Sequence, residues 1–338
     1  MSDIKHILVI RLSSMGDVAM TVPVLAAFSK AHPTIRITVL TKKQFAPLFK
    51  DLQTVTVLLV DFTTTHKGVY GLYKLSKQIR NTSVDAVADL HNVLRTKILS
   101  VFLLGLNFVQ IDKGRSEKKA LISGNLRVPL RTTPQRYADV FRRLGFDFDL
   151  DNPSFPEAKQ LDATVLRELG QFSKPVIGIA PFATYASKTY PLSKMEKVIF
   201  ELQKEYKVLL FGGGLNEINL LKKIASKSPN VYCVAGTFEL DQELDIISNL
   251  KVMLSMDSSN GHIAAMLGVS VVTLWGVTHP FAGFAPFGQL DRNNLLSDLN
   301  KYPQIPTSIY GNKYPEGYAL AIETINVKTI VKTVKANL

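Results

Sequence analysis

The sequence predicts an α/β protein made of two halves, each built on a doubly wound parallel sheet. Short apolar runs alternate with segments of helical periodicity along most of the chain, as in that architecture. One design occurs twice, in His6–Phe28 and in Val252–Gly268: a buried strand, a break at small residues, and then a helix. Between the two copies, residues 146–160 contain two prolines, four acids and no strong periodicity, which indicates a linker.

The first half is predicted to follow this strand–helix order, with one interruption. Its expected strands are Ile7–Ile10, Ile35–Thr41, Val55–Val60, Ala86–Leu90 and Val109–Ile111, and its expected helices are Val18–Ala31, Gln44–Lys50, Gly71–Asn81, Asn92–Leu104 and Thr133–Leu144. The segment Asp112–Arg131 breaks the order and is predicted to be a long basic loop.

The second half restarts the order after the linker. Its expected strands are Pro175–Pro181, Lys207–Phe211, Val231–Val234, Val252–Leu254 and a last strand Val269–Trp275, and its expected helices are Lys194–Glu205, one from Asn216, Asp241–Asn249 and Val327–Ala336. We therefore expect one domain over residues 1–150, a second over 160–320, and a C-terminal helix within 321–338 that packs back towards the first domain.

Composition and charge limit the functional classes. The 338 residues suffice for two cores, and the net charge of +12 is concentrated in residues 1–160, which carry +10. This excess fits an anionic partner such as nucleic acid, an anionic lipid surface or an acidic glycan, or else a solvated surface. The single cysteine, Cys233, excludes an internal disulfide, and no metal-ligand spacing is present. With neither a signal-peptide layout nor an apolar stretch of membrane-spanning length, the expected location is cytoplasmic.

Asp17 follows the first strand in the stretch RLSSMGDV, where Ser14 and Gly16 precede the acid. Ligands bind open α/β sheets outside the carboxyl ends of the strands, so Asp17 is a candidate general base for a hydroxyl nucleophile. The structural alternative is an N-cap of the next helix.

The second copy of the design, Asp257-Ser258-Ser259-Asn260-Gly261-His262, suits a phosphate or diphosphate. Its small residues expose helix-terminal amides, and the serines add hydroxyl donors. The alternative is capping by Asp257 together with a structural histidine.

Three other positions are weaker candidates. The glycines 212–214, with Glu217 in the following helix, allow close approach of a ligand or simply make a tight turn. Lys188, in the loop after the second half's first strand, is suited to neutralise a leaving phosphate, or else is a solvated lysine. His91 and Arg95 follow the strand that ends at Asp89, where a helix cap with a basic face is the alternative.

Taken in order, these motifs resemble glycosyltransferase family 9, the ADP-heptose:lipopolysaccharide heptosyltransferases. The resemblance covers nearly the whole chain. Its motifs are IRLSSMGDVAMTVPVL, VADLHNVLRT, IGIAP with Lys188-x-x-Pro191, FGGGxxE, AGTxxL, and DSSNGHIAA with WGVTHP. Two departures are a serine, Ser259, where the family often has glycine, and His91-Asn92 where it often has Gln-Gly.

The resemblance implies a GT-B fold, in which two Rossmann-like domains face each other across a cleft, and inverting transfer. It implies Asp17 as general base, Lys188 as the diphosphate-binding lysine, and a nucleotide-sugar site formed by Gly213, Glu217, Asp257, Ser258, Ser259 and His262. No metal or other cofactor is expected, because Lys188 and the helix amides suit the charge that develops on the leaving diphosphate.

The expected partners are an ADP-sugar, with ADP-heptose as the named candidate, and an anionic glycolipid acceptor, with peripheral association at the inner membrane and no nucleic acid. The residues expected to bind the acceptor are Ser14, Gly16, His91, Arg95, Lys113, Arg115, Lys118 and Lys119. The alternatives are a transferase for a different nucleotide sugar and a GT-B-type sugar-nucleotide epimerase. A dinucleotide oxidoreductase is disfavoured because G-x-G-x-x-G is absent.

Overall fold

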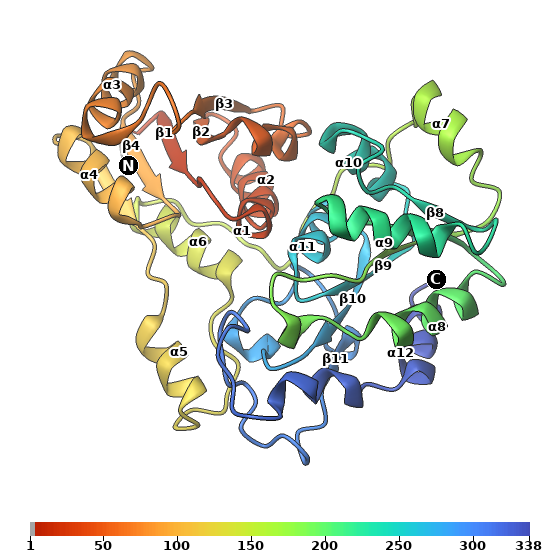
Figure 1. The fold of residues 1–338 in the computed structure, drawn as a ribbon. Coiled ribbons are helices and arrows are strands. Elements are labelled where there is room, and N and C mark those ends of the chain that lie inside the picture. Colours follow the sequence, from red (N-terminus) through yellow and green to blue (C-terminus); the bar gives the residue numbers. More distant parts are fainter. Residues whose placement is uncertain (1–3) are drawn as a thin grey trace. The chain divides into compact units, whose positions relative to one another are not determined.

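The computed structural model describes residues 4–338, so the first three residues of the predicted first domain lie outside the described part. The chain divides into two compact units (Figure 1). The first consists of Met1–Lys113 and Thr133–Ser154, and the second of Gly114–Thr132 and Phe155–Leu338. The chain thus passes between the units three times, whereas the sequence predicted a single passage.

The first unit has a five-stranded parallel sheet in the order β3-β2-β1-β4-β5. Its elements are β1 (His6–Ile10), α1 (Met15–Ala19), α2 (Thr21–Ala31), β2 (Arg36–Lys42), η1 (Lys43–Phe49), β3 (Val55–Val60), α3 (Gly68–Asn81), β4 (Ala86–Asp89), α4 (Leu94–Phe102), β5 (Asn107–Gln110) and α6 (Thr133–Arg143). Leu8 and Ile10 of the central strand pack with α3 and α4. Ile7 and Val9 are equally buried and point to the opposite face, so the sheet is covered on both sides.

The single helix predicted from Val18 to Ala31 is two helices, α1 and α2, that meet at Met20. Pro23 accounts for the break, because it has no N–H to donate to the carbonyl of Ala19 and its ring crowds that carbonyl. The Thr21 hydroxyl donates to the carbonyl of Val18 at 2.6 Å. The short helix α1 is thereby separated as the element that carries Asp17.

The second unit has a six-stranded parallel sheet in the order β11-β10-β9-β6-β7-β8. Its elements are α5 (Arg115–Ile122), α7 (Ala163–Leu169), β6 (Val176–Ala180), η2 (Ala186–Lys188), α8 (Leu192–Leu202), β7 (Lys207–Leu210), α9 (Leu215–Ala225), β8 (Val231–Cys233), α10 (Leu240–Ser248), β9 (Val252–Met256), α11 (Ser259–Met266), β10 (Ser270–Trp275), η3 (Pro280–Ala282), η4 (Asp291–Asn293), β11 (Asn294–Leu296), η5 (Tyr318–Thr324) and α12 (Val327–Lys335). Strand β10 was predicted to be the last, but β11 follows it at the sheet edge; three residues are too few to show a period.

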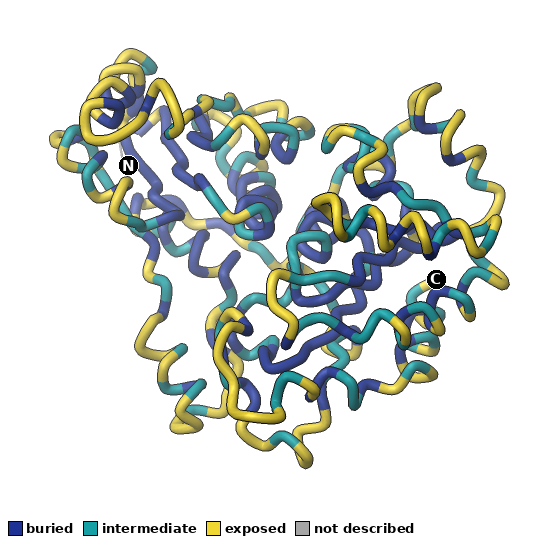
Figure 2. The backbone as a smooth tube through the Cα atoms, viewed as in Figure 1, coloured by how far each residue is buried: buried dark blue, intermediate teal, exposed yellow. Residues whose placement is uncertain are grey.

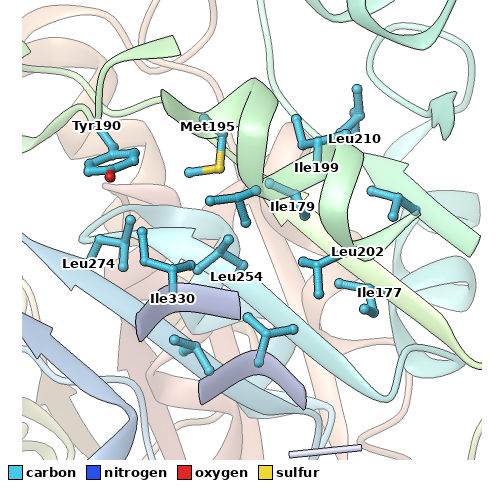
Figure 3. Packing of buried hydrophobic residues seen from close by; sticks show 14 of the residues in the cluster. Ile177, Ile179, Tyr190, Met195, Ile199, Leu202, Leu210, Leu254, Leu274 and Ile330 are labelled. Atoms are coloured by element: carbon cyan, nitrogen blue, oxygen red, sulfur yellow. The ribbon is translucent and has the colours of Figure 1, made fainter. Parts of the chain in front are cut away.

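The core of the second unit joins its sheet to helices α8 and α12 (Figure 3). Ile179 and Leu254 of adjacent strands pack with Met195 of α8 and Ile330 of α12, all of them fully buried. Helix α12 is therefore part of the core of the second unit, and its expected packing towards the first domain stays a prediction. Figure 2 shows that the strands are buried along the chain, whereas the outer sides of the helices are exposed.

The segment predicted as a long basic loop contains a helix, α5, and belongs to the second unit. Leu121 of α5 and Leu130 are buried with Ala282, and the Lys118 ammonium lies 4.2 Å from the centre of the Phe284 ring. This placement also changes the charge distribution. Counted over the sequence by unit, each unit carries +6, so the one-sided excess predicted for the first half is absent.

The predicted linker is partly core. Phe146 and Phe148 are buried against Phe28 of α2, with ring centres 5.6 and 5.4 Å from it. Phe155 belongs to the other unit, where it contacts Phe287 at 6.4 Å. The third passage between the units is therefore at Ser154–Phe155. Within residues 4–338, none of the helices has the length and apolar character needed to cross a bilayer.

Candidate active site

Asp17 lies just beyond the carboxyl edge of the first sheet and is held by two neighbours. The Arg11 Nη2 atom is 2.7 Å from Asp17 Oδ2, and the backbone N–H and the hydroxyl of Ser14 donate to the same oxygen at 3.2 and 2.8 Å. Ser14, not Asp17, is the N-cap of α1, so the capping alternative holds only in a modified form: Asp17 reaches back from the third helical position. The Arg11 guanidinium and the two Ser14 donors thus fix the orientation of this carboxylate.

Arg11 is a site residue that sequence reasoning missed. It is the first residue after β1, it is buried, and its Nη1 donates to the carbonyl of Leu90 at 2.6 Å. Its guanidinium also lies 5.7 Å from the centre of the Tyr137 ring. The Leu90 carbonyl and the Tyr137 ring hold Arg11 in place, and Arg11 in turn orients the Asp17 carboxylate. An arginine after an apolar run gives no sign of this role, which depends on the pairing of β1 with β4.

His91 is held in a tight turn at the same edge. The Asp89 carboxylate accepts the N–H groups of His91 and Asn92, both at 2.9 Å, and Asn92 has a positive φ of 44°, which asparagine tolerates. Burial, and then the Arg11 and Lys113 charges, lower the pKa of His91 to about 3. His91 is therefore neutral at pH 7.

This environment predicts a pH dependence of stability. The pKa of His91 is lower in the folded protein than in the unfolded chain, so the unfolded state binds the extra proton as the pH falls from about 6.5 to about 3. The free energy of unfolding should decrease over that window, by at most about 1.4 kcal/mol per pH unit from this residue. Urea unfolding at pH 7 and pH 4.5 should show a smaller loss for His91→Asn than for the wild type; equal losses would contradict the assignment.

The other predicted acceptor residues are divided between the units. Gly16 is buried in α1, Arg95 is exposed with its guanidinium 4.8 Å from the centre of the Phe62 ring, and Lys113 ends the first unit's first segment. The remaining three lie on α5 of the second unit: Arg115, Lys118 and Lys119. The structure therefore brings Ser14, Asp17 and His91 to one sheet edge and does not place the basic cluster in one unit.

In the second unit, Lys188 and Asp257 form a shielded ion pair. The Lys188 Nζ atom is 2.9 Å from Asp257 Oδ2, and the two side chains are only 13% and 9% exposed. The Thr278 hydroxyl, which sequence reasoning also missed, donates to the same oxygen at 2.8 Å. These residues follow β6, β9 and β10, three adjacent strands, at the edge where the order of the sheet reverses. The N-cap residue of α11 is Ser258, so Asp257 precedes the cap position and pairs with Lys188 instead.

The backbone around Lys188 is packed closely enough to require glycine at two positions. A Cβ atom on Gly276 would lie 1.9 Å from the carbonyl oxygen of Ser187, and one on Gly311 would lie 2.5 Å from Cδ of Lys188. The buried Ser187 hydroxyl donates to the carbonyl of Gly311 at 2.5 Å. The loop around Gly311 thus holds the aliphatic stem of Lys188, so that its ammonium group is presented at a fixed point.

Two glycine substitutions separate structure from binding. Gly276→Ala should lower the free energy of unfolding by about 3 kcal/mol, because a backbone carbonyl cannot yield to the new methyl group. Gly213→Ala should leave stability within about 0.5 kcal/mol, since a Cβ there meets no atom within 4 Å, yet should weaken nucleotide binding if the glycine loop approaches the ligand. Urea unfolding and calorimetric titration with nucleotide measure the two effects, and equal stabilities for both variants would contradict this account.

The first turn of α11 follows directly after Asp257 of this ion pair. Ser258 is the N-cap but makes no capping side-chain bond; its hydroxyl lies 3.2 Å from that of Ser255. Ser259 begins the helix, and His262 is buried in its first turn. The predicted donor residues of this loop are thus adjacent to Lys188, and the uncapped amides suit an anionic group.

Glu217 and the glycine loop form a second arrangement at the same edge. The Glu217 Oε2 atom accepts the N–H of Gly213 at 2.9 Å, so the carboxylate folds back over the loop after β7. Gly213 itself is exposed. A side chain of the following helix thus closes the loop, and the role of Gly213 and Glu217 in ligand binding stays a prediction. Among residues 4–338, no three His, Cys, Asp or Glu side chains are grouped as a metal site would require.

Comparison with known proteins points to one family. Glycosyltransferase family 9 (heptosyltransferase) matches residues 72–312. The lipopolysaccharide core heptosyltransferase OpsX of Haemophilus influenzae is 24% identical over 304 residues, which cover 87% of this chain and 84% of that protein.

Two solved structures share the fold. The family 9 glycosyl transferase of Veillonella parvula superimposes with a TM-score of 0.78 at 18% identity, over 100% of this chain and 98% of that one. The Escherichia coli heptosyltransferase WaaC with ADP has a TM-score of 0.67 at 18% identity, over 98% and 100% of the two chains. The predicted α/β class with two Rossmann-like sheets, the GT-B fold, is confirmed.

Proposed function

Because the chain belongs to glycosyltransferase family 9, we propose that this enzyme transfers heptose from ADP-heptose to the inner core of lipopolysaccharide or a related anionic glycan. The observation that carries the proposal is the shielded pair of Lys188 and Asp257 at the reversal point of the second sheet. The curated relative named above is a lipopolysaccharide core heptosyltransferase, and one of the similar structures is a heptosyltransferase with ADP, which supports the sugar and the nucleotide.

Asp17 is the proposed general base for inverting transfer. An acceptor hydroxyl must lose its proton as its oxygen attacks the anomeric carbon, and the Asp17 carboxylate accepts that proton. Two observations support this role: Arg11 and Ser14 orient the carboxylate, and 24% of the side chain is exposed to solvent. The bond from the anomeric carbon to the diphosphate oxygen breaks as the new glycosidic bond forms, so no covalent enzyme intermediate is needed.

The leaving diphosphate is the proposed ligand of Lys188 and of the first amides of α11. Negative charge grows on the departing oxygen, and a fixed ammonium group with helix-terminal amides stabilises it without a metal ion. Lys188 Nζ and the Thr278 hydroxyl both bond to Asp257 Oδ2, so Oδ1 is available to accept a hydroxyl of the sugar. Glu217 is the proposed partner of the ribose hydroxyls, and Gly213, Ser258, Ser259 and His262 complete the proposed donor site.

Acceptor recognition is proposed for Ser14, Gly16, His91, Arg95, Lys113 and the cations of α5. Neutralising Arg115 and Lys119, both exposed, with Gln should raise the acceptor's KM at low salt and leave donor affinity unchanged. The effect should fade at about 0.5 M salt, where screening removes interactions between exposed charges. If the acceptor's KM changed neither with the substitutions nor with the salt concentration, α5 would have no role in acceptor recognition.

The donor class is tested by thermal unfolding with ADP-heptose and with ADP-, GDP- and UDP-linked sugars. A ligand at a hundred times its Kd stabilises the folded state by about 2.7 kcal/mol, so the preferred donor raises Tm most. If a sugar linked to another nucleotide raised Tm most, the proposed donor would change, but the assignment as a glycosyltransferase would stand. The reaction is proposed to take place on the cytoplasmic side of the inner membrane, without nucleic acid as a partner.

A further inference from the structure

Exposed apolar side chains of the first unit are concentrated on one pair of helices. Among the described residues, this unit has seven exposed large hydrophobic side chains, and six of them lie on α3, on α4 or in the turn after α4: Val69, Tyr70, Tyr73, Leu94, Val101 and Leu104. Tyr70, Leu94 and Leu104 are 69%, 74% and 72% exposed. Single exposed hydrophobic residues are ordinary, but six on two neighbouring helices form a patch that indicates an interaction.

The two helices are one surface. The rings of Tyr73 in α3 and Phe102 in α4 are 5.7 Å apart, and the Arg80 guanidinium donates to the carbonyls of Phe102 and Leu104 at 3.0 and 2.9 Å. Figure 1 shows the helices side by side, and Figure 2 shows the exposed outer side of α3. On α3, Tyr70, Tyr73, Lys74 and Lys77 follow the three- and four-residue spacing of one helical face.

The charge of this surface has a single sign. Helices α3 and α4 contain five cations and no acid: Lys74, Lys77, Arg80, Arg95 and Lys97. The Lys74 and Lys77 ammonium groups lie 4.8 and 4.7 Å from the centres of the Tyr70 and Tyr73 rings. Apolar groups, tyrosine rings and lysines are thus interleaved, which is the composition of surfaces that rest in a membrane interface.

We infer that the α3–α4 surface docks the enzyme on an anionic lipid bilayer. The lysines bind lipid phosphates while the tyrosines and aliphatic side chains enter the headgroup region. A second copy of the same surface fits poorly, because it would bring five cations against five. A nucleic acid would bind the cations and stack on the rings, but it would not bury the apolar side chains of Leu94, Val101 and Leu104. The inference uses none of the residues proposed for proton removal or donor binding, and its test does not depend on turnover.

The test is co-flotation of the full chain with vesicles that contain no glycolipid acceptor. Phosphatidylcholine vesicles with 30% phosphatidylglycerol are compared with pure phosphatidylcholine, at about 0.05 and 0.5 M salt. Each basic residue near an anionic surface changes the partition by roughly fivefold, so Lys74→Glu with Lys77→Glu should lower binding at least tenfold. The matched control is Lys222→Glu with Lys223→Glu on the exposed side of α9, which should bind like the wild type.

A second pair of variants tests the apolar contribution. Tyr70→Ser with Leu104→Ser should reduce the binding that remains at high salt, whereas Leu215→Ser with Leu220→Ser, which are exposed on α9, should not. All these positions are exposed, so unchanged thermal unfolding should verify folding. Absence of vesicle binding, binding that requires the acceptor, equal effects of the α9 controls, or preferential binding to a single-stranded polynucleotide would each overturn the inference.

Discussion

Replacing Asp17 with asparagine is expected to lower turnover by about a hundredfold to ten-thousandfold while leaving folding and nucleotide binding nearly unchanged. Asparagine keeps an oxygen that accepts the Ser14 N–H, so α1 retains its capping interaction. It cannot take a proton from the acceptor hydroxyl. Steady-state transfer assays, circular dichroism and calorimetric titration with ADP measure the three quantities.

Asp162→Asn is the matched control. Asp162 caps α7 in the second unit, where its carboxylate accepts the Val165 N–H at 2.8 Å, and it has no proposed role in transfer. Turnover of this variant should equal that of the wild type. If Asp17→Asn also kept wild-type turnover, Asp17 would be a helix-capping residue only, and the general base would have to be sought elsewhere.

Replacing Lys188 with alanine is expected to weaken nucleoside diphosphate binding and to slow transfer by about a hundredfold or more. It also leaves Asp257, 9% exposed, with Thr278 as its remaining hydrogen-bond donor, so some loss of stability is expected. Calorimetric titration with ADP below the unfolding temperature separates binding from folding.

Lys194→Ala is the corresponding control, because Lys194 pairs with Glu323 at 3.1 Å but both side chains are more than one third exposed. This substitution should change neither ADP affinity nor turnover appreciably. Unchanged ADP affinity and unchanged turnover in a folded Lys188→Ala enzyme would exclude Lys188 from diphosphate binding.

The parts of the fold that sequence predicts are those fixed by local pattern. Continuous apolar runs mark buried parallel strands whatever they pair with, which is why β1 and β9 were located to within a residue or two. Helix α5 was missed because its charges dominate, and because its Leu121, like Leu130 after it, packs on residues near 282, far along the chain. Assigning charge by halves of the sequence failed for the same reason.

The candidate site divides along the same line. Asp17, Lys188 and Asp257 stand in recognisable motifs, whereas Arg11 and Thr278 are ordinary residues until strand pairing brings them to those carboxylates. The requirement for glycine at position 276 could not be predicted from the sequence. The atom that leaves no room for a side chain there is the carbonyl oxygen of Ser187, which is distant in the sequence.

Because Gly114–Thr132 belongs to the second unit, the order of synthesis affects how the chain can fold. The ribosome releases Leu121 and Leu130 long before Phe281 and Ala282, the residues they pack against, exist. Those leucines stay uncovered until η3 is synthesised, so the first segment of the second unit must wait for the last part of the chain, whereas all residues of the first unit exist once Ser154 is made. A fragment cut after Ser154 would retain the same exposed leucines, and separate expression of the two units would have to carry residues 114–132 with the later one.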